Sequence, residues 1–342
     1  MRILLSQLRR IGDVLMTTPA VAAVRKAYPE AHITYLTEKP SHLIFAHNPH
    51  VDEVLCWPKG GWARLALLRR LRKRRFDLAV DFFCNPRSAM MIRLSGARRR
   101  IGFDFSGRRY AYTERVKPGD ALRYAGQDKV DLLGPLGIGV QHPRPELFLG
   151  DAERQYAKTQ LEQLGVRPGD LLVALCPVSR QPYKVWPAKD FARLADILIE
   201  RYQAKIMFFS GPGEQHFIDQ VRLEMHHASL PDYPIPDLLQ MGALLEQAHL
   251  YVGNDNGPRH FALALGTPTV TVFGRPFPQN WTPPPMPGET PRHLTADFDP
   301  GCKATCHYPR CELECIKKVP YEKVQSAAEI LLEEILKNGT PA

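Results

Sequence analysis

The amino-acid sequence predicts an α/β protein made of two doubly wound domains, each a parallel sheet with helices on both faces. Three observations support this prediction. The chain has 342 residues, which exceeds one ordinary core and fits two domains. Short apolar runs alternate with longer amphipathic runs, as in repeated strand–helix units. The stretch GPLGIGVQHPRP, at 134–145, interrupts this alternation and indicates a linker.

The first domain, predicted as residues 1–150, begins with a strand that ends in a loop through Gly12 and Asp13. Further along, Leu65, Leu68 and Leu71 recur on one face of a strongly cationic segment, which predicts a surface helix. The predicted strands cover 2–6, 32–37, 53–56, 76–82 and 99–103, and the predicted helices cover 14–28 and 62–75.

The second domain, predicted as residues 151–320, repeats the alternation. Residues 321–342 form a C-terminal helical segment with an apolar stripe, which we expect to pack back toward the N-terminal domain. Because doubly wound sheets bind ligands at the carboxyl ends of their strands, the expected ligand site is the cleft that the two domains face across. The predicted strands cover 171–176, 205–210, 250–253 and 269–273, and the predicted helices cover 151–164, 188–202, 215–226, 237–247, 258–265 and 321–337.

Positive charge is concentrated in the first half of the chain. The net charge is +9, but residues 1–150 hold 26 lysines and arginines against 13 acidic residues, whereas 151–342 hold 19 against 23. This asymmetry predicts an anionic partner for the first half. No apolar run approaches the ~18 residues that span a bilayer. The start MRILLSQLRRIGD is typical of neither a signal peptide nor an anchor, so we expect a cytoplasmic protein.

The segment VGNDNGPRH lies between a predicted strand and a predicted helix. Gly253 and Gly257 permit a tight turn and the close approach of a ligand to the backbone. The unpaired N–H groups at the helix start, together with the helix dipole, favour a phosphate. Asp255 can accept hydrogen bonds from sugar hydroxyls, and His260 can donate to a phosphate oxygen. The alternative is an ordinary turn capped by Asp255 or Asn256, with His260 in the core.

Two further loops follow predicted strands of the second domain. In CPVSRQPYKVWP, the hydroxyl of Ser179 and the cations Arg180 and Lys184 can neutralise a diphosphate leaving group, although a surface loop anchored by a tryptophan explains the same residues. In GPGE, Glu214 can bind ribose hydroxyls or simply favour the first turn of the next helix. No Walker loop and no GxGxxG pattern occurs, so neither NTP hydrolysis nor dinucleotide redox chemistry is indicated.

Asp13 is the only carboxylate in the first 29 residues. It follows a strand end and faces cationic neighbours, where it can act as a general base toward a hydroxyl. Its alternative role is that of a helix N-cap, which is common for aspartate at such a position.

Three segments of the chain resemble the lipopolysaccharide heptosyltransferases of glycosyltransferase family 9. They are RIGDVLMTTPAVAAVRKAYPEAHITYLTE, the loop KVWP followed by FARLA, and the turn GNDNGPRHFALALGTPTVTVFG. They occur in the family's order, and the similarity extends from about residue 2 to residue 336. The resemblance implies the GT-B architecture, with the acceptor bound mainly by the first domain and a nucleotide-sugar by the second. It also implies transfer of L-glycero-D-manno-heptose from ADP-heptose with inversion, with neither metal nor cofactor.

The resemblance also assigns roles to residues of the motifs. Asp13 matches the catalytic base that deprotonates the acceptor hydroxyl. Lys184 matches the lysine that binds the diphosphate, with Ser179 and Arg180 nearby. Asp255 matches the residue that contacts the heptose.

Within the last motif, Asn256, Gly257 and His260 match the phosphate-binding turn. The chain departs from the family at Arg259, where an apolar residue, often methionine, is usual. An added cation beside the phosphates is compatible with the implied role. The two other implied donor contacts are Glu214 on the ribose and Met241 near the adenine.

A basic surface is predicted in the first half. Few aromatic residues accompany these cations and no nucleic-acid motif is present, so we expect no nucleic-acid partner. A glycolipid acceptor that carries acidic Kdo sugars at the cytoplasmic face of the inner membrane fits the charge, because basic residues gain about 1 kcal/mol each near such a surface. We therefore expect peripheral membrane contact and a monomer. The acceptor or anionic surface is assigned to Arg9, Arg10, Arg69, Arg70, Arg72 and Lys73.

Four of the seven cysteines, Cys302, Cys306, Cys311 and Cys315, are spaced C-x3-C-x4-C-x3-C. Zinc sites more often use C-x2-C pairs, and disulfides are disfavoured in the cytosol, so we expect reduced thiols or an adventitious metal site rather than a structural zinc. Two other functions stay open from the residues alone: a GT-B enzyme with another nucleotide-sugar, such as a hexosyltransferase or an epimerase, and a non-catalytic basic protein that binds nucleic acid or membrane.

Overall fold

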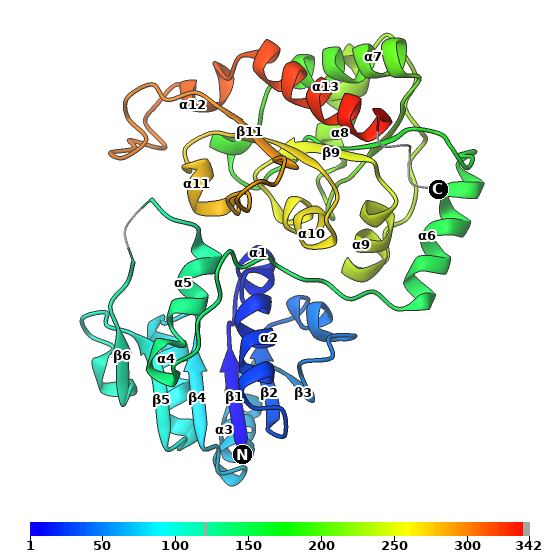
Figure 1. The fold of residues 1–342 in the computed structure, drawn as a ribbon. Coiled ribbons are helices and arrows are strands. Elements are labelled where there is room, and N and C mark those ends of the chain that lie inside the picture. Colours follow the sequence, from blue (N-terminus) through cyan, green and yellow to red (C-terminus); the bar gives the residue numbers. More distant parts are fainter. Residues whose placement is uncertain (120–121, 338–342) are drawn as a thin grey trace. The chain divides into compact units, whose positions relative to one another are not determined.

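The computed structural model describes residues 1–119 and 122–337, and the chain divides into two compact units (Figure 1). Unit 1 comprises residues 1–148 together with 279–284, and unit 2 comprises the rest. The boundary at Phe148 follows the glycine- and proline-rich stretch that the sequence marked as a linker. Both units are parallel α/β structures, as the alternation of apolar and amphipathic runs predicted.

Unit 1 contains a six-stranded sheet in the order β3-β2-β1-β4-β5-β6, and every neighbouring pair is parallel. The strand order reverses between β1 and β4, which makes their carboxyl ends the expected ligand-binding edge. The strands are β1 Arg2–Ser6, β2 His32–Thr37, β3 Glu53–Cys56, β4 Leu78–Asp81, β5 Arg99–Phe103 and β6 Glu114–Val116. The helices are α1 Ile11–Leu15, α2 Thr18–Ala27, α3 Gly61–Lys73, α4 Pro86–Ser95 and α5 Ala125–Asp131, with 3-10 turns η1 Ser41–Phe45, η2 Arg109–Ala111 and η3 Gly134–Leu136.

Unit 2 contains a five-stranded parallel sheet in the order β11-β10-β9-β7-β8, so its strand order reverses between β7 and β9. The strands are β7 Leu172–Cys176, β8 Lys205–Phe208, β9 Leu250–Asn254, β10 Thr269–Phe273 and β11 His293–Asp297. The helices are α6 Asp151–Gln163, α7 Ala188–Tyr202, α8 Gln215–Glu224, α9 Leu238–Glu246, α10 Gly257–Leu265, α11 Pro278–Trp281, α12 Glu314–Lys317 and α13 Tyr321–Lys337, with the 3-10 turn η4 Pro182–Lys184.

The single helix predicted over 14–28 is two helices. Met16 and Thr17 separate α1 from α2, and the Thr17 hydroxyl contacts the Val14 carbonyl oxygen and the Tyr35 hydroxyl, each at 2.7 Å. A hydroxyl that bonds to nearby backbone offers the chain an alternative to a continuous helix. The break matters because α1, which carries Asp13, becomes a separate turn at the end of β1.

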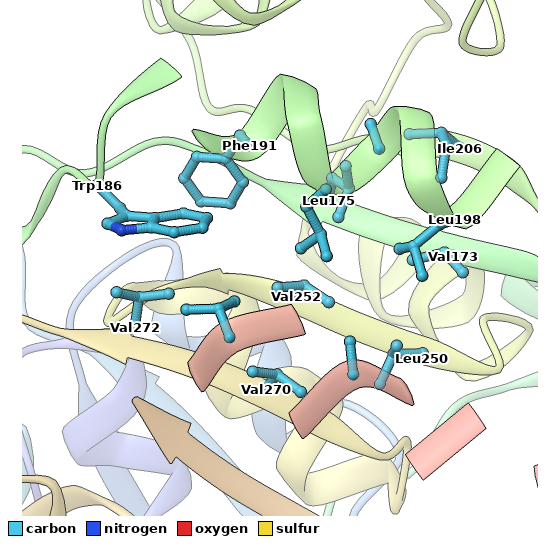
Figure 2. Close-up of a cluster of buried hydrophobic side chains, with 14 of the residues drawn as sticks. Val173, Leu175, Trp186, Phe191, Leu198, Ile206, Leu250, Val252, Val270 and Val272 are labelled. Carbon is cyan, nitrogen blue, oxygen red and sulfur yellow. The ribbon is translucent and has the colours of Figure 1, made fainter. Parts of the chain in front are cut away.

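The core of unit 2 includes Trp186, which is fully buried (Figure 2). Its ring lies edge-on to Phe191 at 5.0 Å between centroids and parallel to Tyr321 at 6.3 Å. Tyr321 begins α13, whose buried side chains join the same core as β9 and β10. The sequence led us to expect that this helix packs toward the first domain. In the structure, Val324, Ala327, Leu331 and Leu332 of α13 are buried in the core of unit 2.

Candidate functional site

Asp13 lies in α1, at the carboxyl end of β1. Its Oδ2 accepts a hydrogen bond from the backbone N–H of Arg10 at 3.1 Å. Arg10 is the N-cap residue, so Asp13 occupies the third helical position and not the cap that sequence reasoning offered as an alternative. Within residues 1–119 and 122–337, no donor contacts its Oδ1. Half-buried and singly bonded, Asp13 retains an oxygen that can accept a proton.

Lys129, from α5, lies at the same edge of the sheet. Its Nζ donates to the Phe82 carbonyl oxygen at 2.6 Å, just beyond β4, and to Gln7 Oε1 at 3.3 Å, just beyond β1. Gln7 in turn donates to the Arg9 carbonyl oxygen. Burial lowers the pKa of Lys129, and the nearby negative charge of Asp13 opposes that change. Sequence reasoning missed Lys129, because nothing in YAGQDKVD distinguishes a lysine that bonds to strand ends from one on the surface.

A second carboxylate at the end of β4, Asp81, is structural. Its side chain is fully buried, and the Tyr112 hydroxyl donates to Oδ2 at 2.8 Å while the backbone N–H of Cys84 donates to Oδ1 at 3.0 Å. A Cβ added at Gly102 would lie 2.4 Å from the Tyr112 ring, so this glycine makes room for the tyrosine. The network fixes the end of β4 beside Lys129.

Lys184 and Asp255 form an ion pair at the switch point of unit 2. Lys184 lies in the loop after β7, and Asp255 directly follows β9, which neighbours β7 in the sheet. The Asp255 side chain is only 3% exposed, whereas that of Lys184 is 19% exposed. Sequence reasoning predicted both as donor-binding residues, and the fold brings them together where ligands bind in such sheets.

Arg259 contacts the other oxygen of the same carboxylate. Its side chain is fully buried, and Nη1 lies 3.9 Å from Asp255 Oδ1. Nε donates to Thr271 Oγ1 at 2.9 Å, and the guanidinium lies over the Phe273 ring, 4.9 Å from its centroid. Burial alone would raise the pKa of Asp255, but Lys184 and Arg259 hold it below its ordinary value.

His260 follows Arg259 and is buried. Burial, and then the positive charge of Arg259, lower the pKa of His260 to about 3. The imidazole is therefore neutral at physiological pH. A neutral imidazole carries one ring N–H and adds no positive charge to the site.

In the turn before α10, the polar Asn256 holds the backbone in place, whereas the two glycines differ in the space around them. Asn256 is the N-cap: Oδ1 accepts from the Arg259 N–H at 3.2 Å, and Nδ2 donates to the Val178 carbonyl oxygen at 2.9 Å. This matches the structural alternative for Asn256. A Cβ added at Gly253 would lie 2.8 Å from the Cys176 carbonyl oxygen, whereas one at Gly257 would meet nothing within 4 Å. Only Gly257 leaves open space over the helix start.

The other residues predicted to bind the sugar donor do not contact the Lys184–Asp255 pair in the structure as described. Ser179 is buried and its Oγ accepts the Gln181 N–H at 3.3 Å, which shapes the loop. Arg180, beside it, is exposed. Glu214 Oε2 accepts the Gly211 N–H at 2.9 Å, so one of its oxygens holds the loop before α8. Met241 is a buried residue of α9.

The predicted basic surface is two separate regions of unit 1. Arg9 and Arg10 lie at the carboxyl end of β1, and Arg9 Nε donates to Glu38 at 3.0 Å. The C-terminal half of α3 lies at the opposite edge, where the Arg2 side chain contacts the Arg74 carbonyl oxygen at 3.2 Å. There a hollow of about 500 Å³ is lined by Arg2, Ala66, Arg69, Arg70, Lys73 and Arg74. Arg72 is exposed on the same helix.

The cysteine-rich segment precedes α12 and ends within it. All seven cysteines of the chain are free thiols. Lys303, whose side chain is fully buried, anchors the segment through Asp297 at 2.7 Å. Over the described part of the chain, no three histidine, cysteine, aspartate or glutamate side chains are arranged to hold a metal ion. In the same residues, no helix has the length and apolar character to cross a membrane.

A family model described as glycosyltransferase family 9 (heptosyltransferase) matches residues 64–296. Lipopolysaccharide heptosyltransferase 3 of Escherichia coli is 26% identical over 290 residues, which cover 80% of this chain and 83% of that protein. Lipopolysaccharide heptosyltransferase 1 of Pseudomonas aeruginosa is 26% identical over 322 residues, covering 90% and 88%.

Among solved structures, a glycosyltransferase family 9 protein from Veillonella parvula superposes with a TM-score of 0.83 at 24% identity, covering 97% of each chain. The E. coli ADP-heptose heptosyltransferase II superposes with a TM-score of 0.76 at 20% identity, covering 98% of this chain and 99% of that one. At these identities the likeness establishes the fold, which is the GT-B class with two doubly wound α/β units.

Proposed function

Because the chain belongs to glycosyltransferase family 9, we propose that it transfers L-glycero-D-manno-heptose from ADP-heptose to a hydroxyl of the lipopolysaccharide inner core. The relatives that carry such names support this choice of donor and acceptor. The observation that carries the proposal is the chemistry at the two switch points: a carboxylate with an available oxygen in unit 1, and a carboxylate between two cations in unit 2.

Asp13 is the general base of the proposed reaction. Its Oδ1 accepts the proton of the acceptor hydroxyl as that oxygen attacks the anomeric carbon from the face opposite the diphosphate. The bond from the anomeric carbon to the diphosphate oxygen breaks, and ADP departs with the electron pair. One displacement without a covalent enzyme intermediate inverts the anomeric centre.

Unit 2 binds the donor and stabilises the departing ADP. Lys184 neutralises the diphosphate, with Arg180 at the loop surface, and the open backbone at Gly257 admits the phosphates to the start of α10. Asp255 accepts hydrogen bonds from heptose hydroxyls. Since a lysine and a helix N-terminus supply positive charge at the leaving group, we propose that transfer needs no metal.

The second oxygen of Glu214 and the buried edge of α9 at Met241 complete the proposed donor site. Glu214 accepts from the ribose hydroxyls, and Met241 contacts the adenine. His260 donates one neutral N–H to a phosphate oxygen.

Product analysis by mass spectrometry tests the proposal. Purified protein is incubated with ADP-heptose and a Kdo-containing acceptor, with and without a chelator. We expect a product heavier by one heptose and equal rates in both samples. No turnover with ADP-heptose, together with turnover of a UDP-sugar, would replace the proposed donor. A rate abolished by the chelator and restored by a divalent ion would overturn metal independence.

We further propose that α3 contacts the cytoplasmic face of the inner membrane. Trp62, Leu65, Ala66, Arg69 and Lys73 recur at the spacing of one helix face, and all five are exposed, Trp62 to 86%. Interfacial helices combine an aromatic anchor with cations in this way. Within the same helix, Arg70 is paired with Glu53 at 3.0 Å and contributes less.

Vesicle sedimentation tests this contact. Trp62→Ser should reduce binding to vesicles with anionic lipid at low salt, and neutral vesicles should bind little protein in either case. Leu223→Ser is the matched control, because Leu223 is 85% exposed on α8 of unit 2. An equal loss of vesicle binding in both variants would refute the proposal that α3 contacts the membrane. Vesicle binding that salt does not weaken would refute it as well.

A further inference from the structure

Two cations share one buried carboxylate in unit 2, and they are not equivalent. Lys184 contacts Oδ2 of Asp255 from a loop, with 19% of its side chain exposed. Arg259 approaches Oδ1 from within α10, with its side chain fully buried. Each oxygen thus has its own cation, and only one of the two cations reaches solvent.

Arg259 is held independently of Asp255. The hydrogen bond from Nε to Thr271 and the stacking over Phe273 both attach its guanidinium to β10. The guanidinium therefore keeps its place whether or not a ligand is present. Lys184, in contrast, is held by its ion pair with Asp255 alone among the side chains that the structure describes.

Donor binding requires Lys184 to turn from Asp255 to the diphosphate. If Lys184 were the sole counter-ion, this movement would leave a charged carboxylate buried without a partner, which is strongly unfavourable. A second fixed cation removes that obstacle.

We propose that Arg259 is the permanent counter-ion of Asp255, and that it leaves Lys184 free to bind the diphosphate of the nucleotide-sugar. Arg259 is thus a positioning residue, which acts through Asp255 and Lys184. The inference rests on the proposed function, since it takes a diphosphate as the ligand of Lys184. The low pKa of His260 fits the same arrangement, because Arg259 adds a positive charge beside the imidazole.

Calorimetric titration of the full chain with ADP tests the proposal. Arg259→Gln keeps a donor for Thr271 but removes the charge, and we expect ADP affinity to fall about ten-fold; Arg259→Lys keeps the charge and should stay within about three-fold of the wild type. In an Asp255→Asn background, where Lys184 has no carboxylate to hold it, Arg259→Gln should change ADP affinity less than about two-fold.

Three outcomes would overturn the proposal. ADP affinity unaffected by Arg259→Gln would show that the charge is not needed. An equal loss in the Asp255→Asn background would mean that Arg259 acts on the ligand directly or through the fold. If Arg259→Gln does not fold, Arg259→Lys carries the test, and a ten-fold loss in that folded variant would count against the counter-ion role. Wild-type protein that binds no ADP would instead refute the proposed function.

Discussion

Each unit has a carboxylate at the switch point of its sheet, but the surroundings of the two carboxylates differ. Asp13 of unit 1 is half-buried, accepts one backbone N–H, and has Lys129 nearby without a direct hydrogen bond. Asp255 of unit 2 is almost fully buried and has a cation on each oxygen. The first arrangement suits a group that must take up a proton, and the second suits a charge that must persist. The two switch points thus differ in the charge that surrounds their carboxylate.

The largest expected effect is that of Asp13→Asn. The amide cannot accept the hydroxyl proton, and loss of a general base lowers kcat by roughly 10²–10⁴-fold. ADP affinity, which depends on unit 2, should stay at the wild-type value. Stopped-time product assays and calorimetric titration of the same preparation measure the two quantities. A variant that retains full kcat would show that Asp13 is not the base.

Lys184→Gln should act on unit 2 alone. It removes charge from the leaving diphosphate, so kcat/KM for the donor should fall by roughly 10²–10³-fold, as for loss of one preorganised donor. ADP affinity should fall as well, in contrast to Asp13→Asn. Steady-state kinetics with varied ADP-heptose measure the first effect. If both variants changed ADP affinity equally, the division of tasks between the two carboxylates would be wrong.

Lys129→Met should have a smaller effect, about ten-fold on kcat, with the KM for the donor unchanged. The variant loses the hydrogen bonds to Gln7 and Phe82 that order the loop before Asp13. Lys129→Arg keeps the charge and should recover most of the rate. A rise in donor KM equal to the fall in kcat would point to a general loss of folding.

The effect of the Asp13 charge on Lys129 can be measured separately, as a change in the pKa of Lys129. Asp13 raises the pKa of Lys129 against the effect of burial, so Asp13→Asn should lower that pKa further. Asp81 at the end of β4, Cys84 beyond it and Asp128 on α5 act in the same direction and remain in the variant. The pH dependence of Lys129 acetylation, followed by mass spectrometry, should shift to lower pH. An unchanged pH profile of acetylation would show that the charge of Asp13 does not act on Lys129.

The smallest expected effect concerns His260 and acid stability. Its pKa is about 3 in the folded chain and 6.5 in the unfolded one, so unfolding takes up a proton between these values. The free energy of unfolding should therefore decline as pH falls below 6.5, by up to about 1.4 kcal/mol per pH unit from this group. Urea unfolding at pH 7, 6 and 5 should show a shallower decline for His260→Gln. Parallel curves would mean that His260 is not buried in its neutral form.

Sequence patterns predicted the strands that carry both sites, because buried parallel strands are short apolar runs. They did not predict α4, β6 or β11. For α4 a signal was present: Asn85 caps the helix through the Ser88 N–H at 2.8 Å, and Pro86 follows the cap. β11 carries polar residues and is half-exposed, which conceals the apolar run of a strand.

The sequence predicted which loops carry the candidate site, but it did not predict which of their side chains contact one another. Lys184 and Asp255 were identified separately, yet their contact depends on β7 and β9 being neighbours across 71 residues of sequence. Arg259 attracted notice only as a departure from the family, because sequence does not reveal which face of a helix an arginine takes. Local sequence patterns identify the candidate residues, but the strand order of the sheet determines which of them lie close together.

Trp186 couples the loop that carries Lys184 to a helix far along the chain. It follows Lys184 by two residues, its backbone N–H donates to Asn254 beside Asp255, and its ring stacks on Tyr321 at the start of α13. A small shift of α13 would therefore reach the loop that carries Lys184 through one rigid side chain.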